Sequence, residues 1–216
     1  MNFYVLLLAA ALNPGVASAK ESPSTLFAHP VDESDPDLRA VQDRLAAVIH
    51  VRSEFTQTKR MKALARPLES RGTVLVADDL GVVWQVEHPV TSSVVISSAG
   101  MVHVDEAGRK RTMKPSRKPI LFRVMTAFVA VLRGDTASIA REFELYFATT
   151  DTGWEIGLTP KQRLVKRAIR DITLRGSETI DQIRIREPNG DSTVIDLSSI
   201  DTNHELTPDE RRLFPR

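Results

Sequence analysis

Short segments in which apolar and polar residues alternate recur along most of the chain, separated by turn residues such as Asp79-Leu80-Gly81. Successive side chains of a β-strand point to opposite faces, so this alternation is typical of strands that cover a core on one face. Their regular spacing favours an antiparallel meander. The segments are residues 55–59, 72–77, 82–86, 93–97, 101–104, 143–149, 154–158, 168–174, 179–187 and 192–197.

A sheet of about ten strands predicts a mainly β fold, and left open it would have unpaired edges and one uncovered face. We therefore expect it to close into a barrel or to pack on itself. Helical spacing of Leu38, Val41 and Leu45 predicts a helix over residues 37–54. A second helical region is expected over residues 118–141, and a short helix after Thr207.

The segment Ile120–Leu132 does not fit a plain barrel. Only Arg123 and Thr126 are polar among its 13 residues, whereas a surface helix normally keeps one polar face. It is also too short to span a bilayer, which needs about 20 apolar residues. Two alternatives remain: ordinary core at the mouth of the barrel, or a lid over a lipophilic cavity that Met125 and Phe128 help to line.

The N-terminal residues predict export. An apolar run at residues 5–12 precedes Asn13-Pro14-Gly15 and Ala17-Ser18-Ala19, a pattern typical of a signal peptide cleaved after Ala19, although no basic residue precedes the run. Residues 20–36 are rich in Ser, Pro and acidic residues and are expected to form a disordered leader. Residues 37–216 would then form one domain. The chain has no cysteine, which excludes disulfides and a lipid anchor on cysteine.

Catalytic signatures are missing from the sequence. The five histidines show no metal-ligand spacing, and there is no G-x-S-x-G, P-loop or dinucleotide-binding motif. Gly190-Asp191-Ser192 falls in a predicted hairpin turn, where no nucleophile is expected. A formal net charge of +1 does not favour nucleic acid as a partner. We therefore expect neither an enzyme nor a bound metal or cofactor.

A basic run precedes the apolar segment. It is either a solvated loop or a surface that docks on anionic lipid headgroups or an acidic partner. Its residues are Arg109, Lys110, Arg111, Lys114, Arg117 and Lys118.

Several stretches resemble the outer-membrane lipoprotein carrier family, the LolA-like proteins. These are the first helix, FTQTK from Phe55, and residues 72–89, in which Gly72, Trp84 and Pro89 match the family pattern. Residues 65–72 (ARPLESRG) resemble a divergent branch of that family. The resemblance, over residues 38–200, implies an unclosed antiparallel β-barrel of ten to eleven strands whose concave face is covered by helices. It also implies transport of acyl chains across the periplasm, from an inner-membrane exporter to an outer-membrane acceptor.

One position departs from the family pattern. The carriers have an Arg-Pro turn whose arginine tethers the lid, and Asp78-Asp79 stand here instead. The cargo is therefore expected to be a lipid, glycolipid, polyene-type lipid or lipoprotein acyl chain, carried by a monomer. The alternative is a periplasmic sensor or adaptor that binds a protein partner at an inner-membrane complex. The residues expected to line the cargo cavity are Leu45, Ile49, Phe55, Leu75, Trp84, Val95, Met125, Phe128 and Phe147.

Overall fold

The computed structural model describes residues 25–32, 34–77, 80–97, 99–113, 130 and 135–214. In this part of the chain, eleven strands form one antiparallel sheet, which confirms the mainly β prediction. The strands are β1 (His50–Arg60), β2 (Leu68–Ala77), β3 (Gly81–His88), β4 (Ser92–Ser97), β5 (Gly100–Val104), β6 (Lys110–Met113), β7 (Phe143–Thr150), β8 (Gly153–Pro160), β9 (Asp171–Gly176), β10 (Ile180–Arg186) and β11 (Ser192–Asp201).

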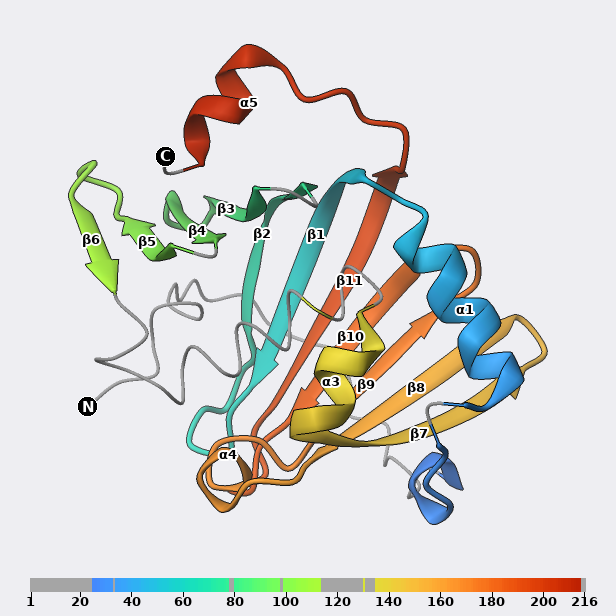
Figure 1. The fold of residues 1–216 in the computed structure, drawn as a ribbon. Helices are drawn as coiled ribbons and strands as arrows, with labels where there is room; N and C mark the ends of the chain where they lie inside the picture. The colour runs from blue at the N-terminus through green and yellow to red at the C-terminus, as the bar shows by residue number, and fades with distance from the viewer. Residues whose placement is uncertain are drawn as a thin grey trace.

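The sheet is built from two meanders that meet at its centre. From β1 the chain steps outward through β2, β3, β4 and β5 to β6, and it resumes at the opposite edge with β7. It then returns through β8, β9 and β10 to β11, which pairs with β1. The two outermost strands, β6 and β7, do not pair with each other, so the sheet curves without closing (Figure 1). The predicted unclosed barrel is thereby confirmed.

Two helices lie against the concave face of the sheet, α1 (Pro36–Ala46) and α3 (Thr136–Glu142) (Figure 1). The Asp35 side chain caps α1 by accepting hydrogen bonds from the backbone N–H groups of Asp37 and Leu38, at 3.1 and 3.0 Å. The apolar residues at helical spacing, Leu38, Val41 and Leu45, are all buried.

The first helix is shorter than expected. It ends at Ala46 instead of continuing to Glu54, because residues 50–53 are the first residues of β1 and pair with residues 74–77 of β2. Ile49, which continues the helical spacing in the sequence, lies in the connection and is 63% exposed.

The predicted second helical region is described only at its end, by Ala130 and α3. Met125 and Phe128 lie outside the described residues, as do residues 1–24, Asp78, Asp79, Lys114, Arg117 and Lys118. A single turn, α4 (Arg163–Lys166), connects β8 to β9.

The C-terminal helix, α5 (Pro208–Leu213), packs on the convex face. Phe214, which follows it, lies in a small apolar core with Leu75, Val83 and Val95. Thr207 and Glu210 form a capping box at its start.

Glu210 also ties α5 to the sheet. Its carboxylate accepts a hydrogen bond from Arg52 of β1 at 2.7 Å and lies 3.0 Å from His204 Nε2. Burial alone would raise the pKa of Glu210, but hydrogen bonds from Thr207, His204 and Arg52 outweigh it and lower the pKa from 4.5 to about 2.

Residues 25–32, which lie within the predicted leader, contact the sheet. A short 3₁₀ helix, η2 (Thr25–Ala28), buries Leu26 and sets Phe27 edge-on to Tyr146, with ring centroids 5.2 Å apart. The side chains of Leu26 and Phe27 fill the space above Gly157 on the convex face, where a Cβ would lie 2.8 Å from the Phe27 ring. The backbone N–H of Val31 then bonds to the carbonyl of Leu145, so the segment passes around the edge of β7 toward α1.

Candidate functional site

The concave face of the sheet is apolar across both meanders. Its side chains, together with the buried stripe of α1 and with Ile139 and Ala140 of α3, form the main core cluster. Sheet residues of this cluster are Phe55, Val74, Val76, Val82, Trp84, Val94, Ile96, Met101, Phe143, Leu145, Trp154, Ile156, Leu158, Ile172, Leu174, Ile180, Ile183 and Ile195.

Two aromatic residues meet at the centre of this face. Phe55 of β1 and Trp84 of β3 lie on either side of β2, and their ring centroids are 4.2 Å apart. Gly72 of β2 pairs with Phe55 in register and places no side chain between the rings. A Cβ at Gly72 would lie 1.9 Å from the carbonyl oxygen of Gln85.

The structure divides the predicted lining residues between the two faces. Leu45, Phe55 and Trp84 are buried in the concave core, and Phe147 is half-buried against it. Leu75 and Val95 instead lie on the convex face, where Phe214 covers them. The register is the reason: Val74 and Val94 pair with Trp84, so the residues that follow them point the other way.

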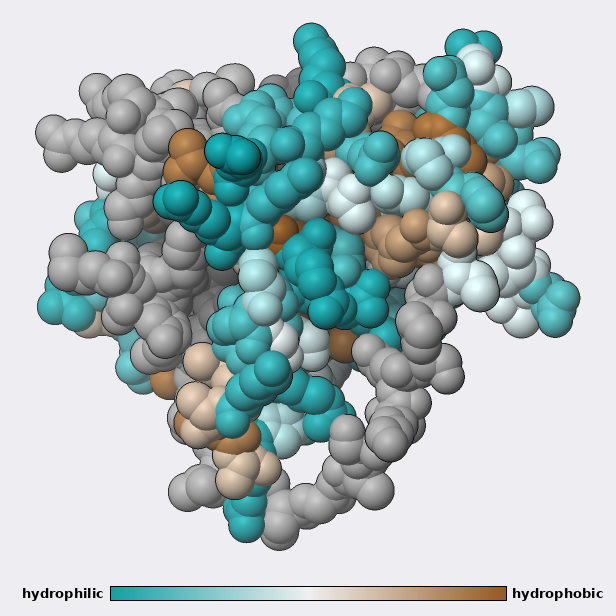
Figure 2. Space-filling view, turned by 90° about the horizontal axis from the view of Figure 1, so that it is seen from below, coloured by the Kyte–Doolittle hydropathy of each residue, from teal (hydrophilic) through white to brown (hydrophobic). Residues whose placement is uncertain are grey.

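Toward the β1–β2 turn the concave face becomes polar, which the sequence reasoning missed. Gln57 Nε2 donates to Ser70 Oγ at 3.2 Å, and Lys59 Nζ forms an ion pair with Glu187 at 3.0 Å. Lys59 is only 6% exposed. The available signal was that Gln57 and Lys59 are in phase with Phe55 along β1. Viewed from this end of the molecule, the described surface is largely hydrophilic, with small apolar patches (Figure 2).

Two buried polar atoms on the core side have no hydrogen-bond partner, among the side chains that the structure describes. One is the hydroxyl oxygen of Ser53, a β1 residue in phase with Phe55 and 2% exposed. The other is Nε2 of Gln42 on α1. Sequence reasoning did not single out either residue.

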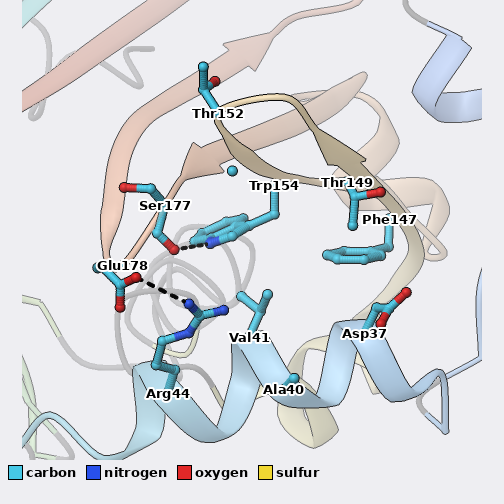
Figure 3. Close-up of a pocket in the computed structure, with 11 residues that line it drawn as sticks. Asp37, Ala40, Val41, Arg44, Phe147, Thr149, Thr152, Trp154, Ser177 and Glu178 are labelled. Atoms are coloured by element: carbon cyan, nitrogen blue, oxygen red, sulfur yellow. Dashed lines mark hydrogen bonds and ion pairs between the residues drawn. The ribbon is translucent and has the colours of Figure 1, made fainter.

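A groove of about 360 Å³ opens between α1 and the turns that join β7 to β8 and β9 to β10. Val41, Phe147 and Trp154 form its apolar part, and Trp154 Nε1 donates to the carbonyl of Ser177 at 2.7 Å (Figure 3). Arg44 and Glu178 face each other across one end at 3.5 Å. Because Val41 and Trp154 also belong to the main core, the groove connects the surface with the edge of that core.

The basic run is described only at its beginning, where it forms part of the β5–β6 hairpin. Arg109 pairs with Asp105 at 2.8 Å, and Lys110 and Arg111 are exposed on the edge strand β6. Beside them on β5, burial lowers the pKa of His103, an effect that Asp105 opposes and Arg111 reinforces. A strand in this position was not predicted.

Neither a metal nor a membrane span is indicated in the described part of the chain. No three His, Asp or Glu side chains there are grouped so that they could hold a metal ion. The helices described there are too short or too polar to cross a bilayer.

The described residues form an unclosed antiparallel barrel whose apolar concave face is partly covered by helices. The family model described as outer membrane lipoprotein carrier protein LolA-like matches residues 31–200. Because the match covers most of the chain, the protein belongs to the LolA-like family, in agreement with the resemblance seen in the sequence.

Solved structures of similar fold include a LolA superfamily protein from Nitrosomonas europaea, at 11% identity and a TM-score of 0.48 over 84% of this chain and 99% of that one. A DUF1329 family protein from Desulfovibrio piger is 13% identical, with a TM-score of 0.47, over 79% of this chain and 92% of that one. A chain of the MucA/MucB complex from Pseudomonas aeruginosa is 13% identical, with a TM-score of 0.41, over 81% of this chain and 60% of that one. Comparison with curated protein sequences gives no match.

Proposed function

We propose that this protein is a periplasmic carrier that binds the acyl chains of a lipid or lipoprotein on its concave face and transfers them between the inner and outer membranes. The observation that carries the proposal is the continuity of the apolar concave face across both meanders, centred on Phe55 and Trp84, in a LolA-like chain. No reactive group is required for this task.

The free energy of burying an acyl chain requires that the concave face be partly filled before the cargo binds. Burying one CH₂ group is favourable by about 0.8 kcal/mol, so a chain of about 16 carbons would gain roughly 12 kcal/mol in an empty dry pocket. Cargo held so tightly would not be released. The apolar side chains of α1 and α3 already contact the sheet, and an acyl chain that displaces some of these contacts binds with a moderate net affinity.

The groove beside α1 offers a route to the core. Its apolar floor leads from the surface to Trp154 and Val41, and its rim carries Asp37, Arg44 and Glu178. A tail that enters here would pass between α1 and the half-buried Phe147, while its headgroup stays at the charged rim.

Binding of a fluorescent fatty acid to delipidated protein tests the proposal. We expect saturable binding by the wild-type protein and at least about tenfold weaker binding by Phe147→Glu, because a carboxylate is strongly disfavoured beside an acyl chain. Ala148→Glu is the matched control, since Ala148 precedes the same turn on the opposite face of β7. Its binding is expected to equal that of the wild type.

Analysis of lipids that co-purify with the protein gives an independent readout. Recovery of an acylated species supports a carrier. Absence of any acylated species, together with no binding of the fluorescent fatty acid, would overturn the proposal. A stoichiometric protein partner recovered without lipid would favour the sensor or adaptor alternative.

A further inference from the structure

Ser53 presents a hydroxyl group where the fold calls for an apolar residue. Its neighbours in phase along β1 are Val51 and Phe55, and its partner on β2 is Val74. All three contribute to or pack against the main apolar core. The Ser53 hydroxyl is nevertheless buried there without a hydrogen-bond partner in the described part of the chain.

An unpaired buried hydroxyl is unfavourable by about 1–3 kcal/mol, and most buried polar groups in folded proteins are paired. Alanine at this position would avoid the penalty without leaving a large cavity. None of the described residues pairs with this hydroxyl, whereas a bound molecule could complete its hydrogen bond.

Gln42 supplies a second group of the same kind. It lies on α1, four residues after Leu38 and three before Leu45, and so flanks the buried stripe of the helix. Its Nε2 atom is buried and has no hydrogen-bond partner among the residues that the structure describes. An amide nitrogen donates hydrogen bonds and does not accept them, so its missing partner is an acceptor.

We propose that Ser53 and Gln42 donate hydrogen bonds to carbonyl oxygens of the bound lipid, so that the protein selects acyl esters over plain hydrocarbon. This inference rests on the proposed function and names its ligand chemistry. An acyl ester combines an apolar tail with a carbonyl oxygen that accepts but does not donate. One donor lies on β1 of the sheet and the other on α1, the helix that packs on the concave face.

The test compares methyl palmitate with hexadecane, two probes of similar length of which only the first has a carbonyl group. Each probe displaces a hydrophobic fluorescent dye from the delipidated full chain. We expect wild-type protein to prefer methyl palmitate. Ser53→Ala and Gln42→Met should each weaken methyl palmitate binding by about tenfold, equivalent to one hydrogen bond, and leave hexadecane binding unchanged.

Two controls make the result specific. Ser93→Ala deletes a hydroxyl from β4 on the convex face and should change neither affinity. Thermal unfolding without ligand should show Ser53→Ala to be at least as stable as the wild type, because the substitution removes no hydrogen bond to any described residue.

Equal binding of methyl palmitate by the wild type and Ser53→Ala would overturn the inference. So would an unliganded Ser53→Ala protein that melts below the wild type, since the hydroxyl would then have a structural role. A parallel loss of both probes would indicate a change of cavity shape and would also overturn it. If the wild type binds neither probe, the proposed function itself fails and the inference falls with it.

Discussion

The rings of Phe55 and Trp84 are 4.2 Å apart although β2 separates the strands that carry them. Gly72 makes this approach possible because it has no side chain between them, and the backbone of β3 passes too close for a Cβ to fit there. The centre of the concave face is therefore specified by three positions on three adjacent strands.

Gly72→Ala is expected to lower the free energy of unfolding by about 3 kcal/mol, because a Cβ would lie 1.9 Å from the Gln85 carbonyl oxygen and the β2–β3 pairing must shift. Chemical denaturation followed by circular dichroism measures the loss. Gly108→Ala is the control: nothing lies within 4 Å of its Cβ, and its φ of +73° predicts a loss of only about 1–2 kcal/mol. Equal effects of the two substitutions would contradict the packing argument.

Bound lipid should be detected by Trp84. The chain has only two tryptophans, so Trp154→Phe leaves Trp84 as the sole emitter and Trp84→Phe leaves Trp154. A fatty acid brominated along its chain quenches tryptophan at contact. We expect strong, saturable quenching of Trp84 at the centre of the apolar face. Quenching confined to Trp154 would place the ligand at the groove beside α1 and away from the centre of the concave face.

Protonation of Glu210 at low pH is expected to weaken the attachment of helix α5 to strand β1. The pKa of this carboxyl is lowered from 4.5 to about 2 in the folded protein. Its contribution, of the order of 3 kcal/mol, is therefore complete above about pH 4.5 and is lost as the pH falls toward 2. Glu210→Gln should abolish this part of the pH dependence of unfolding, whereas Asp209→Asn, at an exposed neighbouring position, should leave it intact. Identical pH profiles of the wild type and Glu210→Gln would refute the assignment.

The N-terminal segment is expected to stabilise the fold through Phe27. Its ring contacts Tyr146 and lies 5.5 Å from the guanidinium carbon of Arg186. Phe27→Ala should lower the free energy of unfolding by about 2 kcal/mol, less than for a fully buried ring, and should expose residues 25–32 to protease. Thr25→Ala, at an exposed position of η2, should change stability by less than about 0.5 kcal/mol. Protease sensitivity equal to that of the wild type would contradict this role.

The β5–β6 hairpin is predicted to dock on anionic membranes. Each basic residue near such a surface contributes about 1 kcal/mol, so the double variant Lys110→Glu/Arg111→Glu should bind anionic phospholipid vesicles at least about tenfold more weakly at low salt. Lys166→Glu/Arg167→Glu is the matched control, because these two residues are also adjacent and exposed. Vesicle sedimentation measures both. A larger loss in the control pair would move the docking surface to α4.

Alternation along the strands predicted ten of the eleven strands and their approximate positions in the sequence, but not the pairing of β1 with β11 or the strand β6. It also did not assign faces in segments that are apolar throughout. Residues 74–77 are such a run, so the sequence did not show whether Val74 and Val76 or Leu75 and Ala77 face the concave side. Both faces are buried here because Phe214 covers the convex one. The sequence contained that information only in a residue about 140 positions away, which no local pattern connects to β2.

The end of the first helix was missed for a related reason. Val48 and Ile49 continue the spacing of Leu45, yet pairing of His50 with Ala77 turns this stretch into the approach to β1. Tertiary pairing outweighs a weak helical preference of β-branched residues. Ser53 and Gln42 escaped notice because the lack of a hydrogen-bond partner among the described residues is a property of the packed chain and not of the residue types.

The junction of the two meanders through β1 and β11 has a consequence for biogenesis. Within each meander, neighbouring strands follow one another in sequence, so their pairing needs only local contacts. The pairing of β1 with β11 instead joins residues more than a hundred positions apart. A chain truncated before Ser192 would lack β11, the strand that joins the two meanders. The concave face is therefore expected to become continuous only after β11 has paired with β1.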